Sequence, residues 1–297
     1  MNLGMLNCLV LKQSFNRSNL YYEVRPKTDD IISQIHAFIT STYPDSSGLI
    51  YCTSRISCEI VAYRLRDEFG LSAPHYHAGL DKSDRLRIQN SWQEGDILVI
   101  VATMAFGMGI DKSNVRFVIH YSHPRSIEGY YQETGRAGRD GNSAHCLLFY
   151  STQDKIPIEY LIRMGAGSAS EKQIQRDNLQ HMIRYCENRT DCRRTQLLSY
   201  FDECFSPAHC AHSCDNCKQG QDPAVEEKSY KLTNTATCSD VSNSSMAVPT
   251  APPAILAIPS IDKSMVYTGN LQPTEDDTHP SEKVSLKCDS QLLVESW

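Results

Sequence analysis

Two arginines and a glutamine at regular spacing are the first residues in this sequence that suggest a specific chemistry. They lie in the segment Tyr131-Gln-Glu-Thr-Gly-Arg-Ala-Gly-Arg-Asp-Gly141. If residues 126–139 form a helix, Gln132, Arg136 and Arg139 stand at positions i, i+4 and i+7 and share one face. Guanidinium groups suit phosphate oxygens, and the neighbouring glycines let a backbone approach closely. The composite pattern predicts a phosphate-facing surface, whereas an Arg-x-x-Arg pair alone would indicate only a solvated helix face.

A second segment places a threonine, a Gly-x-Gly turn and an aspartate directly after an apolar run. It reads VATMAFGMGIDK over residues 101–112. Ligands of parallel α/β sheets bind beyond the carboxyl ends of the strands. The hydroxyl of Thr103 is therefore a candidate for holding a phosphate, and Gly109 and Asp111 are candidates for binding a nucleotide. A lone Gly-x-Gly usually marks only a turn, but this one lies between two strong strand candidates.

Two further candidates follow strand-like runs. Ser54 and Arg55 come after the apolar run 48–52, where a helix N-terminus with an arginine would favour an anion. An ordinary helix cap with a surface arginine is an equally good interpretation. His77 ends the short run 74–77, and a histidine in such a place is more often structural than functional.

Four cysteines form a pattern typical of a metal site. The sequence has 12 cysteines, and Cys192, Cys210, Cys214 and Cys217 are spaced C-x17-C-x3-C-x2-C. Short pairs of thiolates suit tetrahedral zinc in a structural site. From spacing alone, other residues compete as ligands, namely His209, His212, Cys186 and Cys204. The clustering favours an intracellular metal site over a secreted disulfide framework.

Strand and helix patterns alternate through the first half of the chain. Apolar runs that suit buried strands occur at 48–52, 74–77, 97–101, 115–120 and 144–150, and helical spacing occurs at 55–69, 81–94 and 126–139. This alternation predicts an α/β fold with a parallel sheet of about five strands. Further helices are expected at 153–164, 171–186 and 192–200, with a break at 165–168.

The C-terminal region differs in composition from the rest. Residues 221–297 hold 11 acidic residues, 5 lysines and no arginine, and so account for the whole net charge of −6. Their Ser, Thr and Pro content predicts a disordered tail over 219–297. No stretch approaches about 18 apolar residues, and the first ten residues lack a basic segment, so we expect neither a membrane span nor a signal peptide.

Taken together, these motifs resemble the second RecA-like (P-loop NTPase-like) lobe of RecQ-family DNA helicases, members of superfamily 2. The strings YCTSR, HAGL, VATMAFGMGIDK, VRFVIHY and YYQETGRAGRDG occur in the family's order over about residues 15–150. Residues 14–21 are similar to the family's join between its two lobes. The resemblance divides the chain into 1–28 (end of a first lobe and linker), 29–151 (second lobe), 152–218 (helical zinc-binding subdomain) and 219–297 (tail).

Residues 192–217 also resemble the zinc-binding region of the family. The matching residues are Cys192-Arg-Arg194, Leu197–Phe201 and Cys214-Asp-Asn-Cys217. The resemblance implies structural Zn²⁺ on Cys192, Cys210, Cys214 and Cys217, which makes Cys186 and Cys204 bystanders. The arginines after Cys192 could face DNA, or they could form a solvated helix end.

The resemblance further implies an ATP-dependent 3′-to-5′ motor that unwinds DNA in nuclear repair and recombination. By position, Arg139 would be the arginine finger, supported by Arg136 and Gln132, with Gly109 and Asp111 at the nucleotide. The backbone of DNA at a single-stranded/duplex junction would be contacted by Ser54, Arg55, His77 and Thr103.

One part of the family's pattern is absent from the sequence. The 297 residues contain no Gly-Lys pair, and hence no phosphate-binding G-x-x-x-x-G-K-[ST] motif, and no D-E-x-H after an apolar strand. ATP and Mg²⁺ would bind only with a complete first lobe, and we expect this chain alone to lack DNA-stimulated ATPase activity. Two functions stay open: the C-terminal half of a helicase, or a non-catalytic zinc-stabilised module that binds DNA or another helicase chain. A decayed copy is a third reading, which the intact motifs disfavour.

Overall fold

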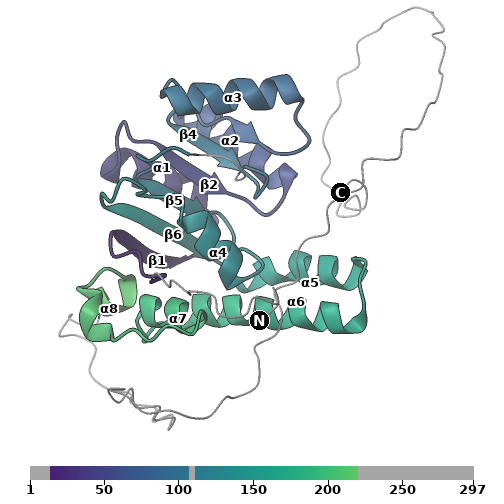
Figure 1. Ribbon diagram of the computed structural model, residues 1–297. Coiled ribbons are helices and arrows are strands. Elements are labelled where there is room, and N and C mark those ends of the chain that lie inside the picture. Colours follow the sequence, from purple (N-terminus) through teal and green to yellow (C-terminus); the bar gives the residue numbers. More distant parts are fainter. Residues whose placement is uncertain (1–13, 107–110, 220–297) are drawn as a thin grey trace, which may run out of the picture. The chain divides into compact units, whose positions relative to one another are not determined.

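A single parallel sheet forms the centre of the α/β lobe. The computed structural model describes residues 14–106 and 111–219. Within them, six strands pair in the order β1-β6-β5-β2-β4-β3 (Figure 1), and every pairing is parallel. The strands are β1 Leu20–Pro26, β2 Gly48–Tyr51, β3 His75–Tyr76, β4 Val99–Ala102, β5 Phe117–His120 and β6 Ala144–Tyr150. The predicted α/β class is confirmed, with one strand more than the sequence patterns indicated.

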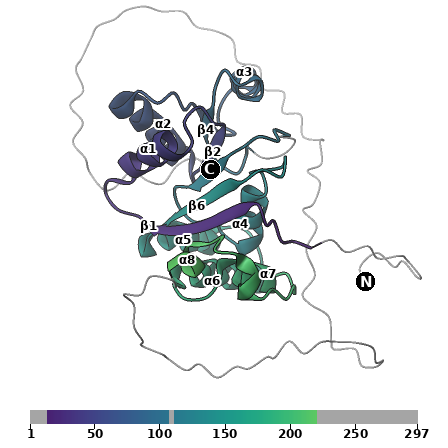
Figure 2. The same ribbon diagram turned by 90° about the vertical axis from the view of Figure 1, so that its left-hand side faces the viewer.

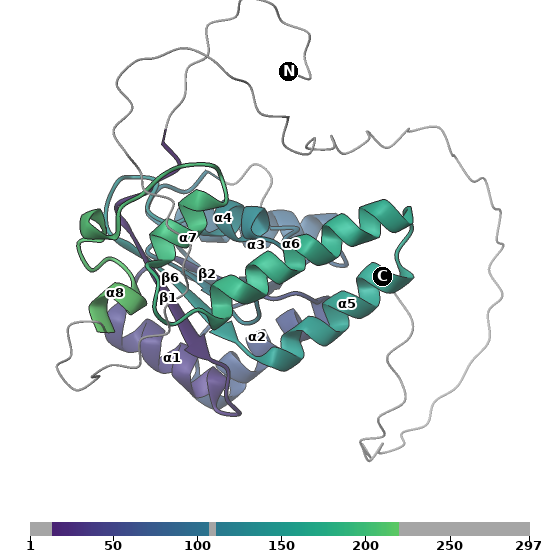
Figure 3. The same ribbon diagram turned by 90° about the horizontal axis from the view of Figure 1, so that it is seen from below.

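Helices connect the strands and then continue beyond the sheet. The connecting helices are α1 Ile31–Thr42, α2 Arg55–Phe69, α3 Lys82–Glu94 and α4 Ile127–Thr134. After β6 come η1 Thr152–Asp154, α5 Lys155–Met164, α6 Ala169–Glu187, α7 Arg193–Ser199, η2 Pro207–Cys210 and α8 Asp215–Gln219. Helices α5 and α6 lie side by side (Figure 3), and the break between them is the predicted one. Ser168 caps α6 through a reciprocal pair of hydrogen bonds with Glu171.

The sheet is buried on both faces, and alternate residues of each strand face opposite sides. In β2, Leu49 and Tyr51 pack with α3 and α4, whereas Ile50 packs with α1 and α2. The same alternation recurs in β4, β5 and β6. Helices α1 and α2 lie together on one side of the sheet (Figure 2). Burial on both faces explains why the central strands read as continuous apolar runs.

Two elements at the N-terminal end of the described chain were not predicted from the sequence. Residues 20–26, assigned above to the linker, form β1, which pairs with β6 along its full length. Residues 31–42, for which no element was predicted, form α1 and bury one apolar face that includes Ile35 and Phe38. Strand β1 therefore belongs to the sheet of the lobe, although it precedes residue 29.

The helix that was to carry both arginines ends earlier than predicted. Helix α4 stops at Thr134, and residues 135–140 form consecutive turns. Gly138 has a φ of +57°, in the left-handed region that favours glycine. The prediction that Gln132, Arg136 and Arg139 share one helix face is therefore wrong: Gln132 lies on α4, and both arginines lie in the turns.

Some predictions fall outside the described residues. These are the disordered tail over residues 220–297, the first 13 residues of the linker region, and Gly109. Among the helices that the structure does describe, none is both long and apolar enough to cross a membrane.

Candidate functional site

The arginine turn, residues 135–140, is held against the segment that precedes β5. The backbone N–H of Gly138 donates to the carbonyl of Val115 at 2.8 Å, and that of Asp140 donates to Ser113 at 3.2 Å. Arg139 Nη1 lies 3.1 Å from Asp111 Oδ1. The structure thus brings together two predicted nucleotide-site residues, Arg139 and Asp111, through a contact that spacing alone did not show. The pair is exposed, with the Asp111 side chain 91% accessible, so its ionic contact is weak and readily exchanged for another partner.

Both arginines of the turn lie near the hydroxyl of a buried tyrosine. Burial raises the pKa of Tyr51 well above its usual value, and the charges of Arg136 and Arg139 act in the opposite direction. Arg136 also forms a hydrogen bond with this side chain, and the Tyr51 hydroxyl donates to the carbonyl of Phe106 at 2.9 Å. Both arginines of the turn therefore contribute positive charge near Tyr51, and Arg136 also contacts it directly.

A separate group of candidates lies where β2, β3 and β4 end. Ser54 caps α2: its hydroxyl accepts from the backbone N–H of Ser57 at 3.0 Å. Arg55 begins that helix, and its guanidinium lies close to Gly79, where a Cβ would come within 3.2 Å of Nη1. The structure thus has Ser54 acting as a helix cap, and brings Arg55 beside the chain that follows β3.

His77 and Thr103 are largely buried, at 4% and 9% exposure. His77 Nε2 lies 2.9 Å from Glu59 Oε1, and its Nδ1 accepts the backbone N–H of Gly79 at 3.2 Å. Because Nδ1 is an acceptor, Nε2 carries the proton and donates to Glu59. The Thr103 hydroxyl accepts from the N–H of Ala105 at 3.4 Å. Both side chains thus have internal partners that fix the chain at the ends of β3 and β4.

The four predicted metal ligands converge. Their sulfur atoms all lie within 4.8 Å of one another, on Cys192, Cys210, Cys214 and Cys217. The Cys210 and Cys214 sulfurs are 3.7 Å apart, close to the separation of about 3.8 Å that tetrahedral zinc–sulfur bonds of about 2.3 Å impose. The hydrogen bond with the Cys214 thiol lowers the pKa of Cys192 to about 4, against the opposing effect of burial. The donor set fits a structural zinc ion.

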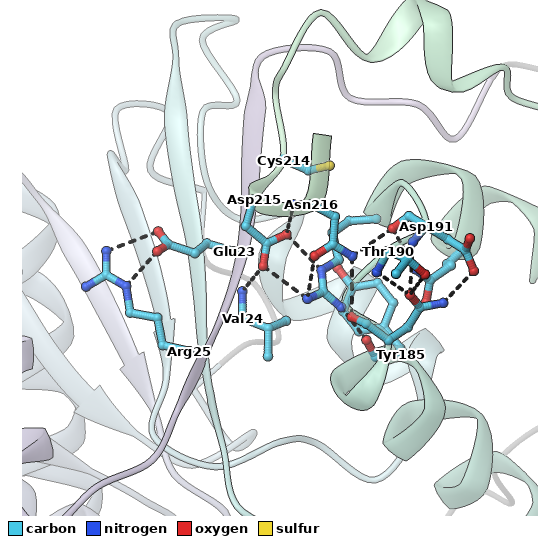
Figure 4. Close-up of polar contacts among 12 residues, drawn as sticks. Glu23, Val24, Arg25, Tyr185, Thr190, Asp191, Cys214, Asp215 and Asn216 are labelled. Atoms are coloured by element: carbon cyan, nitrogen blue, oxygen red, sulfur yellow. Dashed lines mark hydrogen bonds and ion pairs between the residues drawn. The ribbon is translucent and has the colours of Figure 1, made fainter. Parts of the chain in front are cut away.

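Next to the cysteines, Arg193 is buried, with 2% of its side chain exposed. Its guanidinium donates to both carboxylate oxygens of Asp215, at 2.8 and 3.0 Å, and to the carbonyl of Tyr185. Asp215 also accepts the backbone N–H of Val24 in β1 at 2.9 Å. Figure 4 shows Asp215 between Val24 and Asn216. The zinc region therefore covers the outer edge of β1, where unpaired N–H groups would otherwise remain.

Arg194 is buried too, and it contacts the linker that precedes β1. Its Nη1 donates to the carbonyl of Arg17 and to Oδ1 of Asn16, both at 2.8 Å, and its Nη2 donates to the carbonyls of Ser18 and Leu20. The suggestion that these two arginines face DNA or solvent is therefore wrong. Both are structural, because their donors are taken up by carbonyls and carboxylates within the chain.

Sequence reasoning missed linker residues that contact the arginine turn, Arg17 above all. Arg17, in the linker, donates to three carbonyls of that turn, those of Gly135, Ala137 and Gly138. The string Asn-Arg-Ser-Asn at 16–19 was the available signal, since side chains of this kind often bond to backbone groups. Spacing could not reveal a partner almost 120 residues away.

A parallel α/β lobe with two arginines in the turn after α4 is what the resemblance to helicase second lobes led us to expect. In agreement, residues 27–141 match the family model described as helicase conserved C-terminal domain. Residues 152–218 match the model described as RecQ zinc-binding, and they contain the four converging cysteines. The chain belongs to the RecQ family of helicases, of which it carries the second RecA-like lobe and the zinc-binding region.

Named relatives agree with this assignment. The chain is 57% identical over 215 residues to the ATP-dependent DNA helicase hus2/rqh1 of Schizosaccharomyces pombe, covering 72% of this chain and 16% of that protein. It is 48% identical over 237 residues to the RecQ-like DNA helicase BLM of Xenopus laevis, covering 77% of this chain and 17% of that protein. The chain thus spans about a sixth of the length of these relatives.

Among solved structures, Saccharomyces cerevisiae Dbp5 L327V bound to RNA and ADP BeF3 is similar, with a TM-score of 0.44 at 17% identity. The match covers 59% of this chain and 50% of that chain.

Proposed function

We propose that this chain supplies the second lobe and the zinc region of an ATP-dependent 3′-to-5′ DNA helicase that acts in nuclear DNA repair and recombination. The observation that carries the proposal is the adjacency of the two family matches, residues 27–141 and 152–218. Relatives that match more than 200 residues of this chain are named ATP-dependent DNA helicases. The alternative of a non-catalytic binding module is not favoured, because no feature of the described residues calls for it.

In this proposal, Arg139 stabilises the negative charge that develops on the γ-phosphate of ATP. ATP and Mg²⁺ bind at a first lobe, and a guanidinium aimed at the transferring phosphoryl group lowers the barrier electrostatically. Arg136 fixes the turn against Tyr51 and adds positive charge, while Gln132 lies on the exposed side of α4. Asp111 holds Arg139 through the 3.1 Å ion pair and releases it to the nucleotide.

DNA binds, in the same proposal, beyond the ends of β2, β3 and β4. Arg55 supplies the charge, since its guanidinium stands beside the chain that follows β3. Ser54, His77 and Thr103 shape this surface through the internal hydrogen bonds described above. Zn²⁺ on the four cysteines is structural, because a set of four thiolates leaves no open coordination position.

A chimaera tests the proposal. Residues 14–219 of this chain replace the matching segment of the S. pombe relative, to which they are similar enough to exchange. We expect DNA-stimulated ATP hydrolysis and unwinding by the chimaera, and none by the 297-residue chain alone. Arg139→Ala should lower the ATPase rate by about 10³- to 10⁵-fold, whereas Arg87→Ala, on the exposed face of α3, should not change it.

Two results would overturn the proposal. One is a chimaera that folds and holds zinc but hydrolyses no ATP in the presence of DNA. The other is an Arg139→Ala chimaera that keeps the full rate, because the arginine-finger assignment would then be wrong.

A further inference from the structure

The linker before β1 contacts both the arginine turn and the zinc region. We propose that Arg17 is a positioning residue: it holds the backbone of the arginine turn so that Arg139 reaches the γ-phosphate. The inference rests on the proposed function and gives a role to a residue that had none. It also gives the linker an indirect part in hydrolysis, through the position of Arg139.

Arg17 contacts the backbone carbonyls next to both arginines of the turn. Its Nη1 donates to the carbonyl of Gly135 at 3.5 Å, and its Nη2 donates to the carbonyls of Ala137 and Gly138 at 3.1 and 2.8 Å. Two of these carbonyls flank Arg136, and the third directly precedes Arg139. A planar guanidinium with fixed donor directions therefore sets the backbone from which both side chains extend.

A second linker side chain restrains the same turn. Asn19 Nδ2 donates to the carbonyls of Gly138 and Asn142, at 2.9 and 2.8 Å. The fit around Gly138 is tight: a Cβ there would lie 2.5 Å from Asn19 Nδ2 and 2.7 Å from the Asn142 carbonyl. The turn and the linker therefore pack closely against each other, and the contacts of Arg17 are part of this packing.

The linker can hold the turn only if it is itself fixed, and the zinc region fixes it. Arg194, two residues after the ligand Cys192, donates to the Arg17 carbonyl. The ring of Phe15 stacks on Phe201 with centroids 4.9 Å apart, and the Phe15 N–H donates to Glu203 at 2.7 Å. Hydrogen bonds and ring stacking thus connect the zinc region to the linker, and hydrogen bonds connect the linker to the arginine turn.

The chimaera described above provides the kinetic test. Arg17→Ala should lower kcat by about 10- to 100-fold, the cost of a misplaced catalytic group, with less than a twofold change in KM for ATP. Arg17→Lys should restore part of the rate, because it keeps a donor for one carbonyl. Arg25→Ala is the matched control: Arg25 lies eight residues further on, in β1, and bonds to Glu23 at 2.6 Å and not to the turn.

A double variant shows whether Arg17 acts through the finger. If it does, adding Arg17→Ala to Arg139→Ala should leave the residual rate unchanged within twofold. If Arg17→Ala lowers the ATPase rate by the same factor with Arg139 present and with Arg139→Ala, the proposal is overturned. If Arg139→Ala alone has no effect, the proposed function fails, and that outcome is distinct from failure of the positioning role.

Amide exchange in the 297-residue chain tests the positioning itself, without any activity. Arg17→Ala should speed exchange at Gly138 and Asp140, whose N–H groups bond to Val115 and Ser113, while β2 stays protected. Unchanged protection in the turn would overturn the proposal. Should the alanine variant fail to fold, Arg17→Lys takes its place in both experiments, with a smaller loss expected in each.

Discussion

Replacing Arg193 by methionine should destabilise the zinc region strongly. Methionine is close in volume, so the change removes the charge and the hydrogen bonds and leaves most of the packing. The ion pair with Asp215 is almost fully buried, with side-chain exposures of 2% and 7%. Breaking a buried pair by removing one partner costs about 3–5 kcal/mol, because the other charge stays buried.

The surroundings of Asp215 place the expected cost near the lower end of that range. Without Arg193, its carboxylate still accepts the backbone N–H groups of Val24 and Asn216, at 2.9 and 2.8 Å. The carbonyl of Tyr185 loses its donor, which adds a smaller penalty. We therefore expect the free energy of unfolding to fall by about 3 kcal/mol. Arg193→Lys keeps the charge but loses the paired geometry, and should fall in between.

Guanidinium unfolding at a fixed zinc concentration measures this loss. The midpoint should move down by on the order of 1 M. The control is Arg87→Met, since Arg87 pairs with Asp84 at 3.1 Å on an exposed helix face, and its loss should cost less than about 0.5 kcal/mol. If the free energy of unfolding of Arg193→Met lies within about 1 kcal/mol of that of the natural chain, the buried ion pair does not stabilise the zinc region as argued.

Three further outcomes are expected. Burial alone would raise the pKa of Glu23, but hydrogen bonds from His145 and Arg25 outweigh it and lower the pKa from 4.5 to about 2; this contribution to stability is complete above about pH 4.5 and is lost as the pH falls toward 2. Between about pH 4.5 and pH 2, the free energy of unfolding of Glu23→Gln should therefore fall by up to about 3 kcal/mol less than that of the natural chain. An unchanged dependence of the unfolding free energy on pH would contradict this. Chelation should release about one zinc per chain and speed amide exchange at Tyr22, because the N–H of Tyr22 donates to the carbonyl of Ser213 at 3.2 Å. A chain that holds much less than one zinc would rule out the four-cysteine site. Arg55→Ala should weaken DNA binding and reduce the slope of log K against log salt by about 0.7–0.9, and an unchanged slope would exclude a phosphate contact.

The sequence predicted the central sheet well, because its patterns are local. The run 97–101 and its neighbours are apolar and β-branched, as strands buried on both faces must be. It missed α1, although Ile31, Ile35 and Phe38 recur at helical spacing, because no motif drew attention to that stretch. It missed β1 because this strand is defined by its pairing with β6, and a pairing partner more than 120 residues away leaves no local signal.

For the candidate site, too, one part could be predicted from the sequence and another part could not. The identities of the arginines and of the four cysteines follow from the sequence alone, since residue type and spacing determine which chemistry they can perform. That the cysteines converge to within 4.8 Å agrees with the prediction. How the arginines are presented does not follow from spacing, because α4 ends at Thr134 and turns carry them instead.

The class of fold, the family and the set of groups able to bind phosphate and zinc could all be predicted from residue types and their spacing. The contacts of each arginine could not, because they form only on folding. Arg139 meets Asp111 at the surface, Arg193 meets Asp215 in the interior, and Arg17 meets the carbonyls of the turn. The physical reason is that a guanidinium takes its role from the acceptors that folding brings to it, and those acceptors lie 22 to 121 residues away along the chain.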